Sequence, residues 1–255
     1  MADKTYTPGK FVWRELFSND MEGSKKFYSG LFGWTINAMD MGAMTYTMAN
    51  AGETPVCGMM PLETIEMEGV PPHWLSYVSV PNVEEAAAAV ESGGGTVLLP
   101  PKEVGGMGKM CVLRDPQGAV ISAWRANDGD GAEVEKPPVG TFCWDQLGTS
   151  DIDSATAFYE KVFAWSKGPF EGTDQMWVFM RGDKPAASLM QAPEGVPPHW
   201  LTYVVVEDLA ASRAKVTELG GKVMMEEIPV PGIGKFAVIA DNIGAHIALF
   251  EDASK

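Results

Sequence analysis

The chain contains one sequence pattern twice. Three blocks of the first half recur in the second half in the same order: VWRELFSND with FYSGLFGW (12–34) returns as CWDQLGTSD with FYEKVFAW (143–165), GVPPHWLSYVSV (69–80) returns as GVPPHWLTYVVV (195–206), and GMGKMCVLRDPQG (106–118) returns as GIGKFAVIADNIG (232–244). The displacement is 131 positions for the first block and 126 for the others. A period near half the chain indicates two copies of one domain, because a solenoid would repeat at a much shorter spacing.

Length and composition agree with two domains. The chain has 255 residues, of which 45% are hydrophobic, so it can bury two cores of ordinary size. The one shift in composition is ANDGDGAEVEKPP, which is polar, acidic and closed by two prolines, and it reads as a solvated linker. We therefore predict a first domain at 8–125, a linker at 126–138 and a second domain at 139–252.

The charge balance and the cysteines limit the partners and the compartment. The formal net charge of −15 would repel a phosphate backbone and an anionic membrane surface, so we expect neither nucleic acid nor membrane as a partner. The N-terminal residues lack the apolar run of a signal peptide, and no stretch approaches the roughly 20 apolar residues of a membrane span. Cys57, Cys111 and Cys143 are scattered and odd in number, which favours buried thiols in a reducing cytoplasm.

Local patterns predict the same order of elements in each half. An alternating strand leads to a helix cap, at 18–20 in the first copy and at 149–151 in the second, and a helix and short strands follow. The pattern then restarts with a strand (74–80 or 200–206) and a helix (83–92 or 209–219) that ends at Gly93 or Gly220. The order β-α-β-β-β thus occurs twice per half, which predicts an α+β fold with helices on one face of a curved antiparallel sheet.

These motifs resemble the vicinal oxygen chelate superfamily, which includes glyoxalases, bleomycin-resistance proteins and extradiol dioxygenases. The resemblance rests on FYxxxFxW, the HWLxYVxV strand, the GG turn and the closing GxGKxxVxxDxxG hairpin, and it covers nearly the whole chain. It is nearest to two-domain bacterial proteins labelled glyoxalase-like or hydroxylase. It implies two tandem domains, each with paired βαβββ modules that form a cup, and an intramolecular pseudo-dimer. The superfamily spans lyases, oxygenases and metal-free binders, so the fold alone does not decide the function.

The resemblance also implies where a divalent metal would bind. Its ligands, usually His and Glu, come from the first strand, the strand that opens the second module, and the last strand. The matching positions are Trp13, Leu75 and Ser122 in the first half and Trp144, Leu201 and Ala248 in the second. Indole, isobutyl and methyl groups offer no lone pair to a cation, so we predict no metal and no cofactor. A shift of the central strand by two positions would bring in His73 or His199, with Glu15 as a partner in the first cup.

The histidines at 73 and 199 have a structural interpretation as well. Each follows two prolines and enters a strand, where an imidazole commonly binds a nearby carbonyl and stabilises the turn. Because the two copies place this histidine identically, we expect it to have the same architectural role in both.

Strand alternation predicts which side chains face each cup, because residues two apart share a face. We expect these residues to bind the ligand: Trp13, Glu15, Leu75, Tyr77 and Ser122 in the first cup, and Trp144, Gln146, Leu201, Tyr203 and His246 in the second. The alternatives are a solvent-facing carboxylate for Glu15, an exposed residue after a hairpin turn for His246, and core packing for the two tryptophans.

Two classes of function follow. The first is a binding module whose metal-free cup holds or senses a small apolar or aromatic molecule. The second is an enzyme, a lyase or an oxygenase or hydroxylase, with an atypical or absent metal site and with Glu15 or His246 as the catalytic base. The missing metal ligands favour binding. If there is catalysis, we expect it to depend on His246, because an unperturbed imidazole has a pKa of about 6.5 and exchanges protons at neutral pH.

Overall fold

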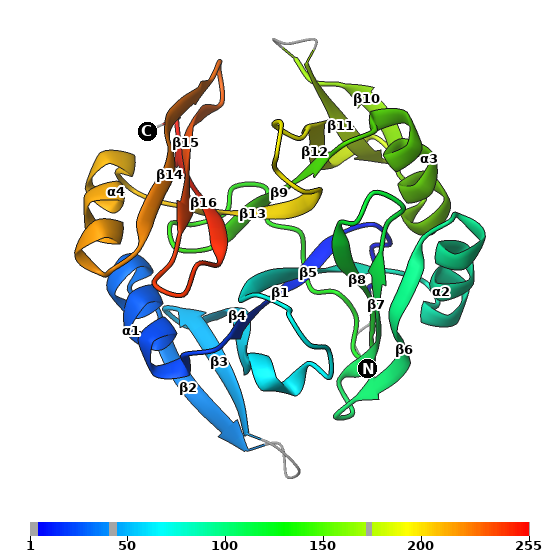
Figure 1. Ribbon diagram of the computed structural model, residues 1–255, viewed down its shortest axis with the longest axis horizontal. Coiled ribbons are helices and arrows are strands. Elements are labelled where there is room, and N and C mark those ends of the chain that lie inside the picture. The colour runs from blue at the N-terminus through cyan, green and yellow to red at the C-terminus, as the bar shows by residue number, and fades with distance from the viewer. Residues whose placement is uncertain (1–4, 41–44, 172–174, 255) are drawn as a thin grey trace. The chain divides into compact units, whose positions relative to one another are not determined.

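The computed structural model describes residues 5–40, 45–171 and 175–254. It contains the strand-helix-three-strand module four times, as the sequence predicts (Figure 1). The first half consists of β1 (Phe11–Ser18), α1 (Met21–Phe32), β2 (Thr35–Asp40), β3 (Thr45–Ala51), β4 (Thr54–Pro61), the short 3-10 helix η1 (Leu62–Thr64), β5 (His73–Ser79), α2 (Val83–Ser92), β6 (Thr96–Val104), β7 (Gly108–Arg114) and β8 (Val120–Ala126). The second half consists of β9 (Phe142–Thr149), α3 (Ile152–Phe163), β10 (Ser166–Pro169), β11 (Met176–Arg181), β12 (Lys184–Gln191), β13 (His199–Val205), α4 (Leu209–Glu218), β14 (Lys222–Val230), β15 (Gly234–Ala240) and β16 (His246–Asp252).

The strands form two eight-stranded sheets with the same order. One sheet runs β2-β3-β4-β1-β5-β8-β7-β6, and the other runs β10-β11-β12-β9-β13-β16-β15-β14. The sheets are mixed, because the first and last strands of each module pair in parallel: β1 with β4, β5 with β8, β9 with β12, and β13 with β16. The helix between the first strand and the rest of a module allows this parallel return, whereas the three later strands pair with one another antiparallel.

The chain divides into two compact units, and neither coincides with a sequence repeat. Unit 1 contains the segment ending at Trp13, together with Leu75–Val134 and Asp145–Trp200, and unit 2 contains Arg14–Trp74, Glu135–Trp144 and the segment from Leu201 onward. Each unit therefore combines segments of both copies. The domain boundaries predicted at 125 and 139 follow the repeats and stay a prediction.

The helices begin where the sequence places their caps. The Asp20 carboxylate accepts a hydrogen bond of 3.0 Å from the Gly23 amide at the start of α1, and Asp151 does the same for Ser154 at the start of α3. These bonds satisfy amides that have no partner inside the helix. The helix α1 ends at Gly33 in the left-handed region, but its counterpart at the end of α3 is Ala164, with a φ of 57°. Glycine is thus favoured here but not essential.

Each unit has a core between a helix pair and the adjoining sheet strands. In unit 2, α1 lies beside α4 (Figure 1), and their apolar residues pack with Leu16, Met59, Ile239 and Leu249. In unit 1, α2 lies beside α3 (Figure 1), and the core includes Val78, Ile121, Leu147 and Leu189. Both helix pairs join one helix from each sequence copy, so the repeats depend on each other for the burial of their apolar surface.

The signature residues of the repeats form a buried hydrogen-bonded triad in each unit. In unit 2, the Trp74 indole donates to the Tyr28 hydroxyl at 2.9 Å, and this hydroxyl donates to the Asp241 carboxylate at 2.8 Å. The equivalent triad in unit 1 joins three residues at 2.9 and 3.0 Å: Trp200, Tyr159 and Asp115. In both triads the aspartate comes from the other sequence copy. The motifs that repeat most strongly are therefore architectural, because they hold the two copies together within one unit.

A second pair of tryptophans binds the chain just before the first strand of each copy. The Trp165 indole donates to the Gly9 carbonyl at 2.9 Å, and the Trp34 indole donates to the Gly140 carbonyl at 2.7 Å. Both glycines have positive φ values, 82° and 81°. These bonds again join residues of different copies, so the tryptophan that ends each FYxxxFxW motif is structural.

Most residues of the predicted linker are exposed, as expected for solvated chain, but two of its acidic side chains are bound to other segments of unit 1. The Asp130 carboxylate accepts hydrogen bonds of 2.6 Å from the Thr7 amide and from the Ser79 hydroxyl. Farther along, the Glu133 carboxylate pairs with both Arg181 and Lys184. The linker is thus exposed to solvent and is also held at two points, where the fold brings four donors to its carboxylates.

The cysteines are free thiols, and two of the three are buried as predicted: Cys57 and Cys111. Cys143 is only partly buried. Among the described residues, no helix is long and apolar enough to cross a membrane.

Candidate functional site

The two histidines that precede the central strands have the structural role expected from the sequence. The His73 Nδ1 donates to the Pro71 carbonyl at 2.8 Å, and the His199 Nδ1 donates to the Pro197 carbonyl at 2.9 Å, since a carbonyl can only accept. The His73 ring also stacks on Phe17, with 5.2 Å between centroids, and burial lowers the pKa of His73. The bond from the imidazole to the carbonyl two residues earlier, expected from the sequence, is confirmed at both sites.

A third apolar cluster lies in unit 2, apart from the two main cores. We call it the aromatic face; it consists of Trp144, Leu201, Tyr203, Phe236, Val238, Ala248 and Phe250, with Cys143 beside them. Its strands are in register, with Tyr203 opposite Ala248 and Phe236 opposite Phe250. The rings of Tyr203 and Phe236 meet edge to face with centroids 5.3 Å apart. Trp144, Phe236 and Phe250 are only partly buried, so the cluster presents aromatic surface that the core does not cover.

The aromatic face brings together most of the residues predicted for the second cup. Trp144, Leu201 and Tyr203 belong to it, and Phe236 and Val238 are additions that alternation along the preceding strand could have found. His246 begins β16 and is exposed, and it lies opposite Ala240. By alternation its side chain shares a face with Ala248 and Phe250. The imidazole therefore stands at the edge of the aromatic face.

Gln146 is not part of this group, because it belongs to unit 1. It is buried, and its amide donates to the Ser188 hydroxyl at 3.2 Å, directly opposite in the sheet. The amide and the hydroxyl thus satisfy each other as a neutral pair.

The residues predicted for the first cup are divided between the units. Trp13, Leu75, Tyr77 and Ser122 belong to unit 1, and Glu15 belongs to unit 2. Tyr77 lies opposite Ser122, and its ring meets Trp124 edge to face at 6.1 Å. The Ser122 hydroxyl is fully buried and donates to the Cys111 carbonyl at 2.9 Å. The Ser122 hydroxyl is therefore engaged in a hydrogen bond within the sheet.

Glu15 lies beside a tyrosine and a glycine that sequence reasoning missed. Glu15 is opposite Gly58 on β4, which is opposite Met48 on β3. A Cβ atom placed on Gly58 would lie 1.9 Å from the Tyr46 hydroxyl and 2.5 Å from the Glu15 Oε1, so both polar groups converge above this glycine. Burial, and secondly the negative charge of Glu15, raise the pKa of the neighbouring Cys57 thiol. Glu15 itself is only 8% exposed.

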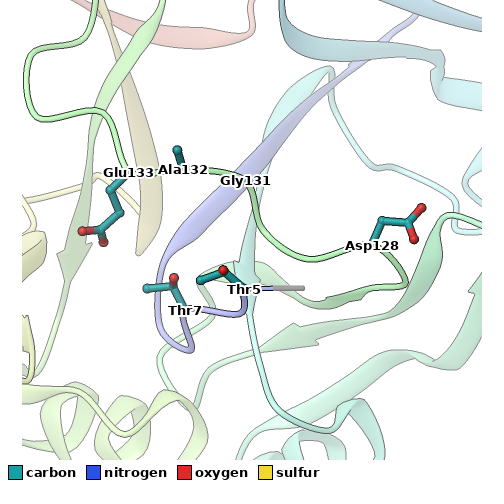
Figure 2. Close-up of a pocket in the computed structure, with 6 residues that line it drawn as sticks. All are labelled: Thr5, Thr7, Asp128, Gly131, Ala132 and Glu133. Carbon is teal, nitrogen blue, oxygen red and sulfur yellow. The ribbon is translucent and has the colours of Figure 1, made fainter. Parts of the chain in front are cut away.

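One pocket in the described part of the chain lies away from all of these residues. It measures about 470 Å³ and is lined by six residues of unit 1: Thr5, Thr7, Asp128, Gly131, Ala132 and Glu133. Figure 2 shows that the carboxylates of Asp128 and Glu133 lie apart, on either side of Gly131. Glu133 is already paired with two cations. No predicted site residue lines this pocket, and its acidic groups do not converge on one point.

Comparison with known proteins agrees with this architecture. Residues 10–123 match the model of the Glyoxalase/Bleomycin resistance protein/Dioxygenase superfamily. The chain is 35% identical over 253 residues to a Mycobacterium tuberculosis protein named "Putative glyoxylase CFP32", with 97% of each chain covered. It is 32% identical over 263 residues to the anthracycline biosynthesis protein DnrV of Streptomyces peucetius, with coverage of 96% of this chain and 94% of that protein.

Solved structures share the fold at low sequence identity. The Mn(II)-bound glyoxalase from Novosphingobium aromaticivorans has a TM-score of 0.67 at 13% identity. The match covers 96% of this chain and 82% of the glyoxalase chain. The 2,3-dioxygenase LapB from Pseudomonas sp. KL28 has a TM-score of 0.63 at 13% identity, and the match covers 97% of this chain and 93% of the LapB chain.

The side chains present do not fit a divalent metal of the kind found in that glyoxalase. Within residues 5–40, 45–171 and 175–254, no three His, Cys, Asp or Glu side chains gather as a metal would require. At the positions implied for ligands, Ala248 has no donor, and the Ser122 hydroxyl is bound to a main-chain carbonyl. A tight site generally needs three or four convergent donors.

Proposed function

This chain belongs to the glyoxalase/bleomycin resistance protein/dioxygenase superfamily, and from that premise we propose that it binds a small planar aromatic molecule on the aromatic face of unit 2. One observation carries the proposal: three aromatic rings on the sheet face opposite the helices remain partly uncovered, namely Trp144, Phe236 and Phe250. Planar ligands stack on such rings and gain both buried apolar area and ring contacts.

The character of the site supports binding by stacking. Leu201, Tyr203 and Ala248 are the buried members of the face, and the partly exposed rings pack against them. The similarity to a protein named for anthracycline biosynthesis points in the same direction, because anthracyclines are fused-ring aromatic compounds. The donor set described above favours a binding mode without a metal.

The test is a titration with 2-naphthol, followed by isothermal calorimetry. Trp144→Ala and Phe236→Ala should each weaken binding by about 1–3 kcal/mol, the usual value of a lost buried aromatic contact. Trp177→Ala is the matched control, because it removes a partly buried indole on β11 in unit 1. Thermal unfolding of each variant shows whether it is folded. Equal affinity in the two face variants and the wild type would refute the proposal.

General-base catalysis by His246 is a second candidate. It is favoured by the place of this imidazole, which is exposed on the strand face that also carries Ala248 and Phe250. A base needs to be within hydrogen-bond reach of the bound substrate, and the edge of a binding face provides that reach.

A further inference from the structure

Glu15, Tyr46 and Gly58 form a polar subsite within unit 2. Three neighbouring strands contribute one residue each: β1, β3 and β4. The Glu15 Oε1 and the Tyr46 hydroxyl lie 2.5 and 1.9 Å from the point that a Cβ of residue 58 would occupy, so they are at most about 4.4 Å apart. Any side chain at 58 would displace them. Glycine is therefore what allows a carboxylate and a phenol to converge here.

The second copy of the sequence shows that the fold does not need this carboxylate. Counted along paired strands, the counterparts of Glu15 and Gly58 are Gln146 and Ser188, which face each other in register as Glu15 and Gly58 do. There the amide donates to the hydroxyl at 3.2 Å, and no charge is buried. Burying a carboxylate costs several kcal/mol unless it is compensated, so a neutral pair is the less costly solution for the sheet.

The phenol is specific to the first copy as well. In the first copy, Gly58 pairs with Met48, and Tyr46 lies two residues before Met48. In the second copy, Ser188 pairs with Val178, and the residue two positions before Val178 is Met176. The second copy thus has a different residue at each of the three positions: Gln146, Ser188 and Met176. Because the two copies share one fold, the module does not require Glu15, Tyr46 and Gly58 in order to form.

We propose that Glu15, Tyr46 and Gly58 bind the primary ammonium group of a small organic molecule. The Glu15 carboxylate supplies the opposite charge, the Tyr46 oxygen accepts a second ammonium hydrogen, and the absence of a side chain at Gly58 lets these two oxygens come close together. An ammonium is compact and has three donors, which suits two acceptors that converge above a glycine. Tyr46 is only partly buried, so the subsite reaches solvent at this residue. Met48, which pairs with Gly58, offers an apolar neighbour for the carbon skeleton of the ligand.

The experiment compares 2-phenylethylamine with 2-phenylethanol by isothermal calorimetry at pH 7, where the amine is protonated. The wild-type protein should bind the amine at least tenfold more tightly than the alcohol. Glu15→Gln, which copies the amide of the other repeat, should reduce amine affinity about 10- to 100-fold, as expected for the loss of one charge-assisted hydrogen bond. Tyr46→Phe should reduce it by a smaller factor, about three- to tenfold.

Glu53→Gln is the matched control, because it removes the same charge from the exposed β3–β4 turn of the same unit and leaves the subsite intact. It should leave amine affinity within twofold, which separates a specific contact from the general attraction of a chain with a net charge of −15. Gly58→Ala tests the space directly, since its methyl group should displace Tyr46 and reduce affinity although no polar group is removed.

Two results would overturn the proposal: equal affinity for amine and alcohol, or equal loss of amine affinity in Glu15→Gln and Glu53→Gln. The triple variant Glu15→Gln/Tyr46→Met/Gly58→Ser guards against misfolding, because it installs the three residues that the fold already contains in its other copy. It should melt near the wild-type temperature and still lose amine binding. 2-Phenylethylamine tests this subsite and 2-naphthol tests the aromatic face, so the failure of one proposal can be distinguished from the failure of the other.

Discussion

The Tyr28 hydroxyl donates a hydrogen bond of 2.8 Å to the carboxylate of Asp241, a residue 213 positions later in the chain. Both groups are buried, and burial raises the pKa of each; for Tyr28 the neighbouring negative charge of Asp241 adds to the effect. The bond joins the cap-helix motif of one copy to the closing hairpin of the other. The most recognisable residues of the repeat thus hold one sequence copy to the other within each unit.

Tyr28→Phe should destabilise the protein by about 1–3 kcal/mol for each buried group left without its partner. The affected groups are the Trp74 indole, which donates to this hydroxyl, and the Asp241 carboxylate. Denaturant unfolding measures the change. Tyr6→Phe is the control, because that exposed hydroxyl binds only a main-chain carbonyl at 3.3 Å, and it should change the free energy of unfolding by less than about 0.5 kcal/mol. Equal effects would contradict the role of the triad.

Gly9→Ala should destabilise the protein more than Gly182→Ala. Both glycines have positive φ, 82° and 63°, so alanine is strained at either site by about 1–2 kcal/mol. At Gly9 the added methyl would also lie 2.7 Å from the Trp165 indole nitrogen, whereas nothing lies within 4 Å at Gly182. Overpacking typically adds about 1–3 kcal/mol. Thermal unfolding of the two variants tests the order, and the reverse order would show that this contact relaxes freely.

His73→Gln should reduce the dependence of stability on pH. Burial lowers the pKa of His73 below the ordinary value of about 6.5, so the unfolded chain takes up the proton at a higher pH than the folded chain does. The stability from the neutral ring is present above pH 6.5 and is lost as pH falls through the lowered pKa. The free energy of unfolding, compared at pH 7.5 and 5.5, should therefore fall less in the variant. Carboxyl groups contribute equally to both proteins, and an identical fall in both would be inconsistent with this account.

The purified protein should hold well under one equivalent of zinc, iron, nickel or manganese after dialysis against a mild chelator. A tight site generally takes three or four convergent donors, and the residues at the implied ligand positions do not supply them. Elemental analysis is the measurement. A stoichiometric metal that is lost in both Glu15→Gln and His73→Gln would establish an atypical site in the first copy instead.

If a substrate that turns over is found, His246→Ala should lower its turnover by about 10²–10⁴-fold, the usual contribution of a general base. Glu15→Gln should have a much smaller effect on turnover, because its carboxylate is placed to bind and not to exchange protons at the aromatic face. Steady-state kinetics of the two variants decides between them. A larger effect for Glu15 would move the catalysis to the first copy.

The sequence by itself determined the repeat, the order of elements and the superfamily. Periodicity and caps are local signals, so the limits of α2 and the caps of α1 and α3 follow from neighbouring residues. The turn role of His73 and His199 was predictable for the same reason, since each bonds to a carbonyl two residues away. Alternation along single strands also placed Trp144, Leu201 and Tyr203 on one face.

Only the tertiary structure decided which copies meet and which polar groups converge. The bond from Tyr28 to Asp241, the attachment of Asp130 to Thr7, and the meeting of Glu15 and Tyr46 above Gly58 all join strands or segments that are distant in sequence. Such contacts depend on strand register and on which modules pack together. Neither leaves a mark on the local pattern of residues, because a tyrosine, an aspartate or a glycine has the same local preferences whether or not a distant partner comes to lie beside it.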